Sequence, residues 1–364
     1  MPLLTEQLIR ELLKNVAVPH GQGDVVSGGW LRGVGIDIDQ NRVALDLRAN
    51  FPIDGIREEL IAEIQQAVAG HPEIEDATVN LTWRVFPHQV QGELKPMPGI
   101  SNIIAVASGK GGVGKSATSV NLALALQADG ARVGVLDADI YGPSVPRMLG
   151  ISGKPETVGK RIVPQRAHGL QVMSIGFMVE EDTPMIWRGP MVTSALQQLL
   201  TETNWENLDY LVVDLPPGTG DIQLTLAQKV PVSGVVVVTT PQDIALLDAR
   251  KAVQMFRRVN VNVLGIIENM NTHICSQCGH EEAIFGSGGG ERMSREYDLP
   301  LLGQLPLSIS IREHLDQGVP TLVAEPGSEI SVRYRACARK MAAVLARQPR
   351  CLEVALPQIK LQNE

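Results

Sequence analysis

The sequence predicts a doubly wound α/β domain, built on a mainly parallel sheet and preceded by a small α+β domain of αββαβ order. The first observation is that near-continuous valine, isoleucine and leucine runs alternate with helical stretches from residue 99 onward, as in a parallel sheet covered on both faces. The second is that the apolar run 103–107 leads through a glycine-rich turn into an alanine- and leucine-rich helix that extends to about Ala128.

The third observation is the N-terminal order of elements. Apolar residues at helical spacing in 3–15 predict a helix, and the segments 31–38 and 42–48 predict two strands joined by a tight hairpin at 39–41. A helix over 56–69 and an alternating strand over 77–85 complete this unit. It contains no catalytic constellation.

The length of 364 residues predicts about two domains. We expect a small domain at 1–88, a linker at 89–99, an ATPase domain at 100–349 and a tail at 350–364. The linker lacks periodicity and contains two prolines, so it either lets the small domain move or is pinned against one of its neighbours.

The large domain contains seven predicted strands. They are 103–107, 132–137, 170–175, 210–214, 234–239, 263–268 and 301–303. Ligands of such sheets bind outside the carboxyl ends of the strands, so motifs that follow these strands are expected to share one site.

The segment 108–116 reads S-G-K-G-G-V-G-K-S and contains a complete phosphate-loop pattern between strand and helix. Glycines allow the backbone N–H groups to converge on an anion. Lys115 supplies charge for the β- and γ-phosphates, and Ser116 offers a hydroxyl to Mg²⁺. The predicted ATP-binding residues of the loop are Gly109, Lys110, Gly111, Gly112, Val113, Gly114, Lys115 and Ser116.

Polar residues follow three other strands. We predict that Asp214 binds Mg²⁺ with support from Asp137, and that Asp139 orients the water that attacks the γ-phosphate. Asn269 follows a later strand, where its amide matches the edge of adenine or serves a turn. Together with Lys110 and Lys115, Asp139 forms the predicted catalytic set.

The net charge of −8 weighs against a protein that coats nucleic acid. Neither a signal peptide nor a long apolar run is evident, so we expect a cytoplasmic protein without stable membrane association. Four cysteines are too few for a disulfide scaffold in this length.

Cys275 and Cys278 form a C-x-x-C pair, which predicts a metal site or redox chemistry. Two thiolates supply half of the four ligands that a closed site needs. Either His273 and His280 complete a zinc site within one subunit, or two subunits each donate a pair; a plain redox pair is a third reading. Cys337 lies on the apolar stripe of the last helix and is expected in the core.

The variant G-K-G-G-V-G-K-S resembles the signature of the deviant phosphate-loop ATPases, which include MinD, ParA and the nitrogenase iron protein. The resemblance implies that Lys110 reaches the phosphates of the other subunit in a nucleotide-sandwich homodimer. A symmetric dimer favours the reading in which two C-x-x-C pairs hold a [4Fe-4S] cluster at the two-fold interface.

Several segments together resemble the Mrp/ApbC iron-sulfur cluster carrier ATPases: 108–116, 137–144, 187–191, 208–221, 268–270 and the C-x-x-C pair. The resemblance implies a dimeric, slow ATPase that passes a cluster to apo-proteins and works with a cluster assembly scaffold. The N-terminal domain is similar to a small domain associated with iron-sulfur assembly, but no cysteine precedes Cys275, so a docking role is expected.

Two other classes share the phosphate loop. A MinD- or ParA-like positioning ATPase with a structural zinc site would need a terminal membrane helix or a DNA-binding face. The last helix, 328–346, carries basic residues, but its apolar stripe is narrow and alanine-rich, so packing on the ATPase body is favoured. A reductase like the nitrogenase iron protein resembles the chain less closely.

Overall fold

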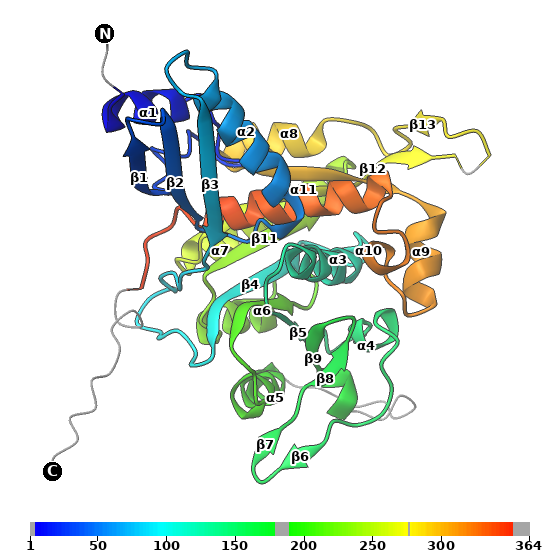
Figure 1. Ribbon diagram of the computed structural model, residues 1–364. Helices are drawn as coiled ribbons and strands as arrows, with labels where there is room; N and C mark the ends of the chain where they lie inside the picture. Colours follow the sequence, from blue (N-terminus) through cyan, green and yellow to red (C-terminus); the bar gives the residue numbers. More distant parts are fainter. Residues whose placement is uncertain (1–3, 179–188, 276, 352–364) are drawn as a thin grey trace, which may run out of the picture.

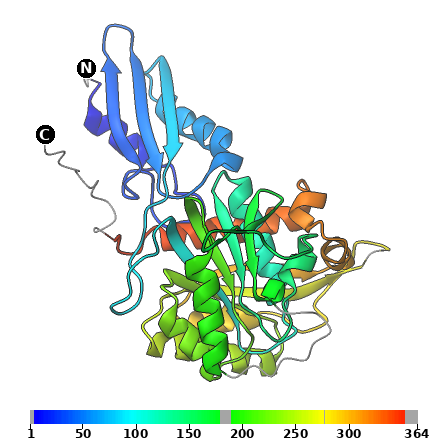
Figure 2. The ribbon, with the colours of Figure 1, turned by 90° about the horizontal axis from the view of Figure 1, so that it is seen from below.

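The computed structural model describes residues 4–178, 189–275 and 277–351 (Figure 1). It contains a small N-terminal domain and a large α/β domain. Figure 2 shows the small domain at one end of the large one. The predicted fold class is confirmed.

The small domain has the predicted αββαβ order. Its elements are α1 (Glu6–Leu13), β1 (Leu31–Asp37), β2 (Arg42–Ala49), the 3-10 turn η1 (Asp54–Ile56), α2 (Arg57–Ala69) and β3 (Asp76–Trp83). Strand β1 pairs with β2 antiparallel, and β2 pairs with β3 parallel. Alternate residues of β2 are buried beneath the helices, which leaves the opposite face of this sheet open.

The first half of the large domain begins with β4, which leads into the phosphate loop, and ends with η2. Its elements are β4 (Ile100–Ser108), α3 (Lys115–Ala128), β5 (Val133–Asp137), α4 (Val145–Met148), β6 (Thr157–Val158), β7 (Arg161–Ile162), β8 (Gln165–Ala167), β9 (Leu170–Ser174) and η2 (Ile175–Met178). Residues 187 and 188, which belong to a segment that carried the family resemblance, lie outside the described residues.

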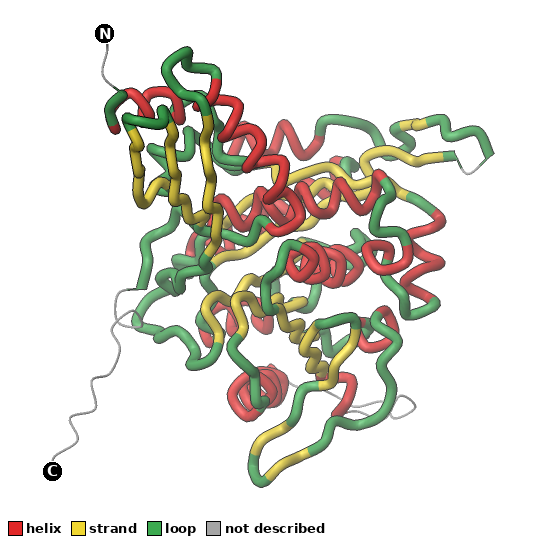
Figure 3. The backbone as a smooth tube through the Cα atoms, in the orientation of Figure 1, coloured by secondary structure: helices red, strands yellow, loops and turns green. Residues whose placement is uncertain are grey.

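The second half completes the sheet and its helical layers. It contains α5 (Gly189–Glu202), β10 (Leu208–Asp214), α6 (Asp221–Lys229), β11 (Gly234–Thr239), α7 (Asp243–Arg258), β12 (Val263–Ile274), β13 (Glu281–Glu282), α8 (Gly289–Tyr297), β14 (Leu301–Leu307), α9 (Ile309–Asp316), α10 (Thr321–Ala324) and α11 (Glu329–Leu345). Figure 3 shows the strands with helices on both sides of the sheet.

The large sheet has the strand order β13-β12-β11-β4-β10-β5-β9-β8, and β14 pairs with β12. Pairs that involve β13 or β8 are antiparallel, whereas the others are parallel. Side chains of β4 alternate between two cores: Ile104 faces the layer with α3 and α11, and Ile103 faces the layer with α5 to α8. Cys337 is buried in the first of these cores, as predicted.

The linker, together with His88 just before it, is pinned to the large domain. His88 is buried, and both its backbone N–H and its Nδ1 contact Asn102 Oδ1, at 3.1 and 3.0 Å. Gln91 is also buried and donates to the carbonyls of Ala227 and Val230. Of the two behaviours expected from the sequence, the structure therefore shows the pinned linker and not the mobile one.

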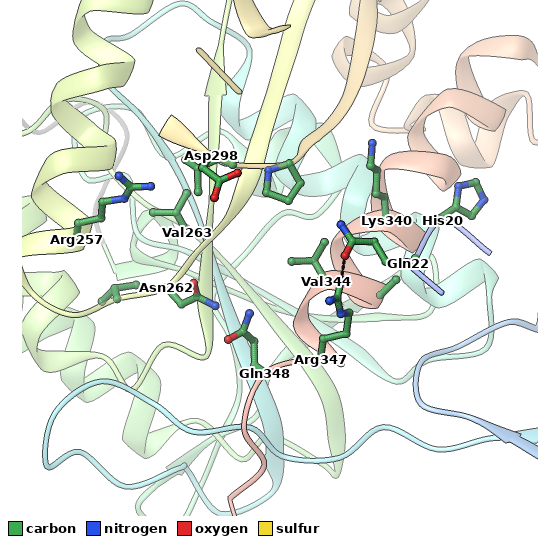
Figure 4. A pocket seen from close by; sticks show the side chains of 15 residues that line it. His20, Gln22, Arg257, Asn262, Val263, Asp298, Lys340, Val344, Arg347 and Gln348 are labelled. Atoms are coloured by element: carbon green, nitrogen blue, oxygen red, sulfur yellow. Dashed lines mark hydrogen bonds between the residues drawn. The ribbon is translucent and has the colours of Figure 1, made fainter. Parts of the chain in front are cut away.

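Polar contacts join the small domain directly to the large one. The Asp54 N–H of the small domain donates to the Asp129 carbonyl of the large one. Within the large domain, Arg339 of α11 donates to both oxygens of the Asp129 carboxylate at 2.7 Å. Arg347 donates to Gln22 Oε1 at 2.6 Å, and both residues line a cavity of about 540 Å³ (Figure 4). This cavity lies at the start of β12, whereas the phosphate loop follows the end of β4.

Candidate nucleotide and metal sites

The phosphate loop connects β4 to α3 as predicted. Gly112 and Gly114 have φ angles of +80° and +79°, which residues with a Cβ rarely adopt. A Cβ on Gly114 would lie 2.2 Å from Asn269 Nδ2, and one on Gly109 would lie 2.1 Å from the carbonyl carbon of Asp248. The loop is therefore held between β12 and α7 at distances that only glycine permits.

Lys115, Ser116 and two of the predicted aspartates meet at the start of α3. Lys115 Nζ lies 2.8 Å from Asp214 Oδ2 and 3.4 Å from Asp139 Oδ2. Ser116 donates to the same Asp214 oxygen at 2.6 Å. Ser119 donates to the other Asp214 oxygen at 2.7 Å. The fully buried Asp214 carboxylate is thus satisfied on both oxygens.

Asp137 lies beside Asp214, because β5 and β10 pair in that register. Its oxygens accept from the backbone N–H groups of Asp139 and Val145 and from the Ser174 hydroxyl. Burial and the Asp214 charge raise the pKa of Asp137 to about 8. Because protein donors already occupy this carboxylate, it suits the supporting role that was predicted.

Asp139 lies next to Lys115 at the mouth of the site. Burial raises the pKa of the Asp139 carboxyl, although the Lys115 charge opposes that shift. The Tyr141 N–H donates to its Oδ1 at 3.2 Å. Of the three predicted aspartates, Asp139 is the only one with any exposure to solvent, since Asp137 and Asp214 are fully buried.

Asn269 lies within β12, not in a turn. It is buried, and its Nδ2 donates to the Val113 carbonyl of the phosphate loop at 2.9 Å. Beside it is a cavity of about 240 Å³, whose lining includes Gly114, Met270, Pro306 and Leu307. This largely apolar space adjoins the phosphate loop.

Lys110 is half-buried. Among the residues that the structure describes, it forms no ion pair, although its carbonyl accepts from the Ser108 hydroxyl. The Lys110 charge therefore has no acidic counterpart in the described part of the chain.

The C-x-x-C pair lies on a hairpin that continues β12 beyond the sheet (Figure 1). The Cys275 N–H donates to the His280 carbonyl, and the Gly279 N–H donates to the Cys275 carbonyl, each at 2.9 Å. Cys275 is half-buried and Cys278 is exposed. Hydrogen bonds from the backbone of Gln277 and Cys278 lower the pKa of Cys275, which favours the thiolate that metals bind.

The described part of the chain brings no three His, Cys, Asp or Glu side chains into a group that could hold a metal ion. His273 and His280 are therefore not assembled with the two cysteines in this single chain. The donor set that the structure offers is two thiolates near a projecting tip.

Two contributors to the site were not predicted from the sequence. Ser119 is three residues after Ser116, so helical periodicity places both hydroxyls on one face, and this spacing is a usable signal. Glu268, at the carboxyl end of the β12–β11 pairing, accepts from the Gly290 N–H at 2.8 Å and from Gln304 at 2.7 Å. It anchors β12 to its neighbours, a role that no local pattern indicates.

Comparison with known proteins identifies the family. Residues 99–342 match the family described as "NUBPL iron-transfer P-loop NTPase". The chain belongs to the iron-sulfur cluster carrier family of P-loop NTPases, which the Mrp/ApbC resemblance predicted. Residues 6–81 match a second family, described as "Iron-sulfur cluster assembly protein", in agreement with the similarity seen in the N-terminal domain.

Relatives of this carrier family extend over most of the chain. An iron-sulfur cluster carrier protein of Haemophilus influenzae is 50% identical over 339 residues, which is 93% of this chain and 91% of that protein. One of Pseudomonas fragi is 55% identical over 75% of this chain and 96% of its own. The mouse iron-sulfur cluster transfer protein NUBPL is 49% identical over 70% of this chain and 81% of its own.

Solved structures agree with the fold. A nucleotide-binding protein from Archaeoglobus fulgidus, in complex with ADP, has a TM-score of 0.56 and 35% identity, covering 64% of this chain and 91% of that one. The cell division ATPase MinD of Pyrococcus furiosus has a TM-score of 0.50 at 21% identity, covering 66% and 98%, which supports the fold alone. In the described residues, no helix of the carrier is long and apolar enough to cross a membrane.

Proposed function

We propose that this carrier binds and hydrolyses ATP and holds a [4Fe-4S] cluster between the Cys275 and Cys278 pairs of two copies. It delivers the cluster to apo iron-sulfur proteins, after loading from a cluster assembly scaffold. The observation that carries this proposal is that one strand, β12, joins both sites. Asn269 of β12 is bonded to the phosphate loop, and Cys275 follows the last residue of the same strand.

The nucleotide part of the proposal rests on the phosphate loop and the groups around Lys115. The loop N–H groups and Lys115 would bind the phosphates, and Asn269 would border the base. Hard oxygen donors are what Mg²⁺ prefers, and the Ser116 hydroxyl and Asp214 carboxylate, 2.6 Å apart, fit that preference. Bound there, Mg²⁺ would neutralise phosphate charge, while Asp139 orients the attacking water.

The cluster part rests on an incomplete donor set. Four thiolates are the usual ligands of a [4Fe-4S] cluster, whereas one chain offers Cys275 and Cys278 at an exposed tip. A second copy related by a two-fold axis would supply the other pair. Lys110, which lacks an ion pair within the described residues, would reach the partner's phosphates in the same homodimer.

The parts of the chain divide this work. We assign nucleotide and cluster binding to residues 100–349 and a docking role to residues 1–88. Residues 89–99 connect them, and 350–364 form the tail. The small domain has no cysteine, so it would contact partner proteins instead of the cluster.

The test compares two cysteine variants after anaerobic reconstitution with iron and sulfide. Cys275→Ala is expected to lose bound iron and sulfide while it binds ATP as the parent does. Cys351→Ala is the matched control, because Cys351 is half-buried and lies far along the chain from the pair. Equal iron content in Cys275→Ala and the parent would defeat the assignment.

A further inference from the structure

Three arginines surround Phe86, where the small domain, the linker and the end of the chain meet. The guanidinium carbons of Arg350, Arg84 and Arg48 lie 4.0, 5.2 and 5.7 Å from the centre of the Phe86 ring. Arg32 of β1 is near enough for its charge to act on Arg350. We call these four residues with Phe86 the arginine cluster.

Ordinary strand geometry assembles the cluster. Alternate residues of β2 are buried, which places Arg48 on the open face of the small sheet. Arg84 follows β3, and its N–H donates to the Ala49 carbonyl. Arg350 arrives from the other end of the chain, because 349–351 pair with 87–89 through the Gln89 and Cys351 N–H groups.

Within the described residues, no acidic side chain pairs with these arginines. In the described parts of the chain, none of the four arginines forms an ion pair, and the buried Nε of Arg48 has no hydrogen-bond partner. Burial and the charges of Arg32 and Arg48 lower the pKa of Arg350. Like charges held together repel one another, although the chain as a whole carries −8. The cluster is therefore complementary to an external anion.

A groove adjoins the cluster. A cavity of about 970 Å³ shares Arg84 and Phe86 with it. The cavity is otherwise lined by residues of the small domain, the linker and the large domain, including Trp83, Met97 and the ion-paired Arg132 and Asp209. The cluster combines arginine with a half-buried aromatic ring, and both residue types are enriched in protein interfaces. Planar guanidinium groups also match carboxylates through paired hydrogen bonds.

We propose that the arginine cluster and its groove bind an acidic peptide segment of a partner protein. A short segment suits the charge pattern better than a long polyanion. Farther along the open face of the same sheet lie the carboxylates of Asp46 and Asp76, which would repel a nucleic acid backbone that continued across it. The proposal concerns a partner site and needs neither bound nucleotide nor cluster.

The test measures fluorescence anisotropy of a fluorescein-labelled hexaglutamate peptide with the full chain at low ionic strength, where screening is weak. Arg84→Glu is expected to weaken binding by about tenfold or more, since it removes a charge-assisted contact. Arg42→Glu is the matched control: Arg42 lies on the same outward face at the far end of β2 and gives the same change in net charge. It is expected to change affinity by less than about twofold.

A neutral peptide and a variant that keeps the positive charge test whether binding depends on charge and on the shape of the guanidinium group. Labelled hexaglutamine is expected not to bind, and Arg84→Lys, which keeps the charge but loses the planar fork, is expected to fall between the parent and Arg84→Glu. Equal weakening by Arg84→Glu and Arg42→Glu would overturn the proposal, as would tighter binding of a labelled oligothymidylate than of hexaglutamate. Thermal melting verifies folding, and Arg84→Gln replaces Arg84→Glu if the latter unfolds.

Discussion

The ammonium group of Lys115 lies 2.8 Å from Oδ2 of Asp214, deep beneath the phosphate loop. Both side chains are buried, so the lysine charge is balanced by a carboxylate and not by water. In the proposed mechanism, an incoming triphosphate would compete with Asp214 for Lys115.

Lys115→Ala is expected to lower the rate of ATP hydrolysis by about 10²-fold or more, because a positioned charge that stabilises the transition state is lost. It also leaves the buried Asp214 charge without its cation, which costs about 3–5 kcal/mol of stability in such cases. Iron content after anaerobic reconstitution should equal that of the parent. Phosphate release by the purified variant at the parental rate would remove the lysine from the mechanism.

Gly114→Ala is expected to weaken ATP binding by about tenfold or more, since a new Cβ at 2.2 Å from Asn269 Nδ2 must displace that side chain or the loop. Gly153→Ala is the matched control: Gly153 has a similar φ of +85°, but nothing lies within 4 Å of a Cβ there. Titration of both variants with a fluorescent ATP analogue compares them. Equal ATP affinities in the two variants would contradict the predicted effect of the Asn269 contact.

Asn269→Ala is expected to weaken ATP binding while iron binding persists. The substitution removes the hydrogen bond to the Val113 carbonyl, which fixes the phosphate loop against β12. Calorimetric titration with ATP measures the effect, and the Asn271→Ala variant, altered two residues farther along β12, is the control. A larger loss of affinity in Asn271→Ala than in Asn269→Ala would contradict this assignment.

His88, at the junction of the small domain and the pinned linker, is expected to make this junction sensitive to acid. Burial lowers the pKa of His88 below its ordinary value of 6.5. Below pH 6.5 the His88 side chain binds a proton more readily in the unfolded chain than in the folded one. The contribution of His88 to the free energy of unfolding is therefore present above pH 6.5 and is lost as the pH falls. Urea unfolding of the parent and His88→Gln across this range should show a weaker pH dependence in the variant. Parallel curves would show that another group is responsible.

Local and periodic features were predictable from the sequence. The neighbouring placement of Asp137 and Asp214 follows from two apolar strands of a parallel sheet, and the structure has these residues in register. Cys337 follows from a helical stripe and is buried.

Contacts between distant segments were not predictable in the same way. The pinning of the linker depends on two such contacts: Asn102 faces His88, and carbonyls near residue 230 face Gln91. The arginine cluster exists only because residue 350 returns to the linker. Such pairings have no periodic signal, since they depend on how the two domains and the chain ends are packed together.

The central claim is that two copies share one cluster through their C-x-x-C hairpins. Native mass spectrometry of anaerobically purified, ATP-loaded protein tests it most directly, because it reports subunit number and bound iron together. The account predicts a dimer that carries about four iron and four sulfide ions per two chains, and a Cys278→Ala protein without them. A monomer that retains the cluster, or an iron-free dimer after reconstitution, would contradict the account.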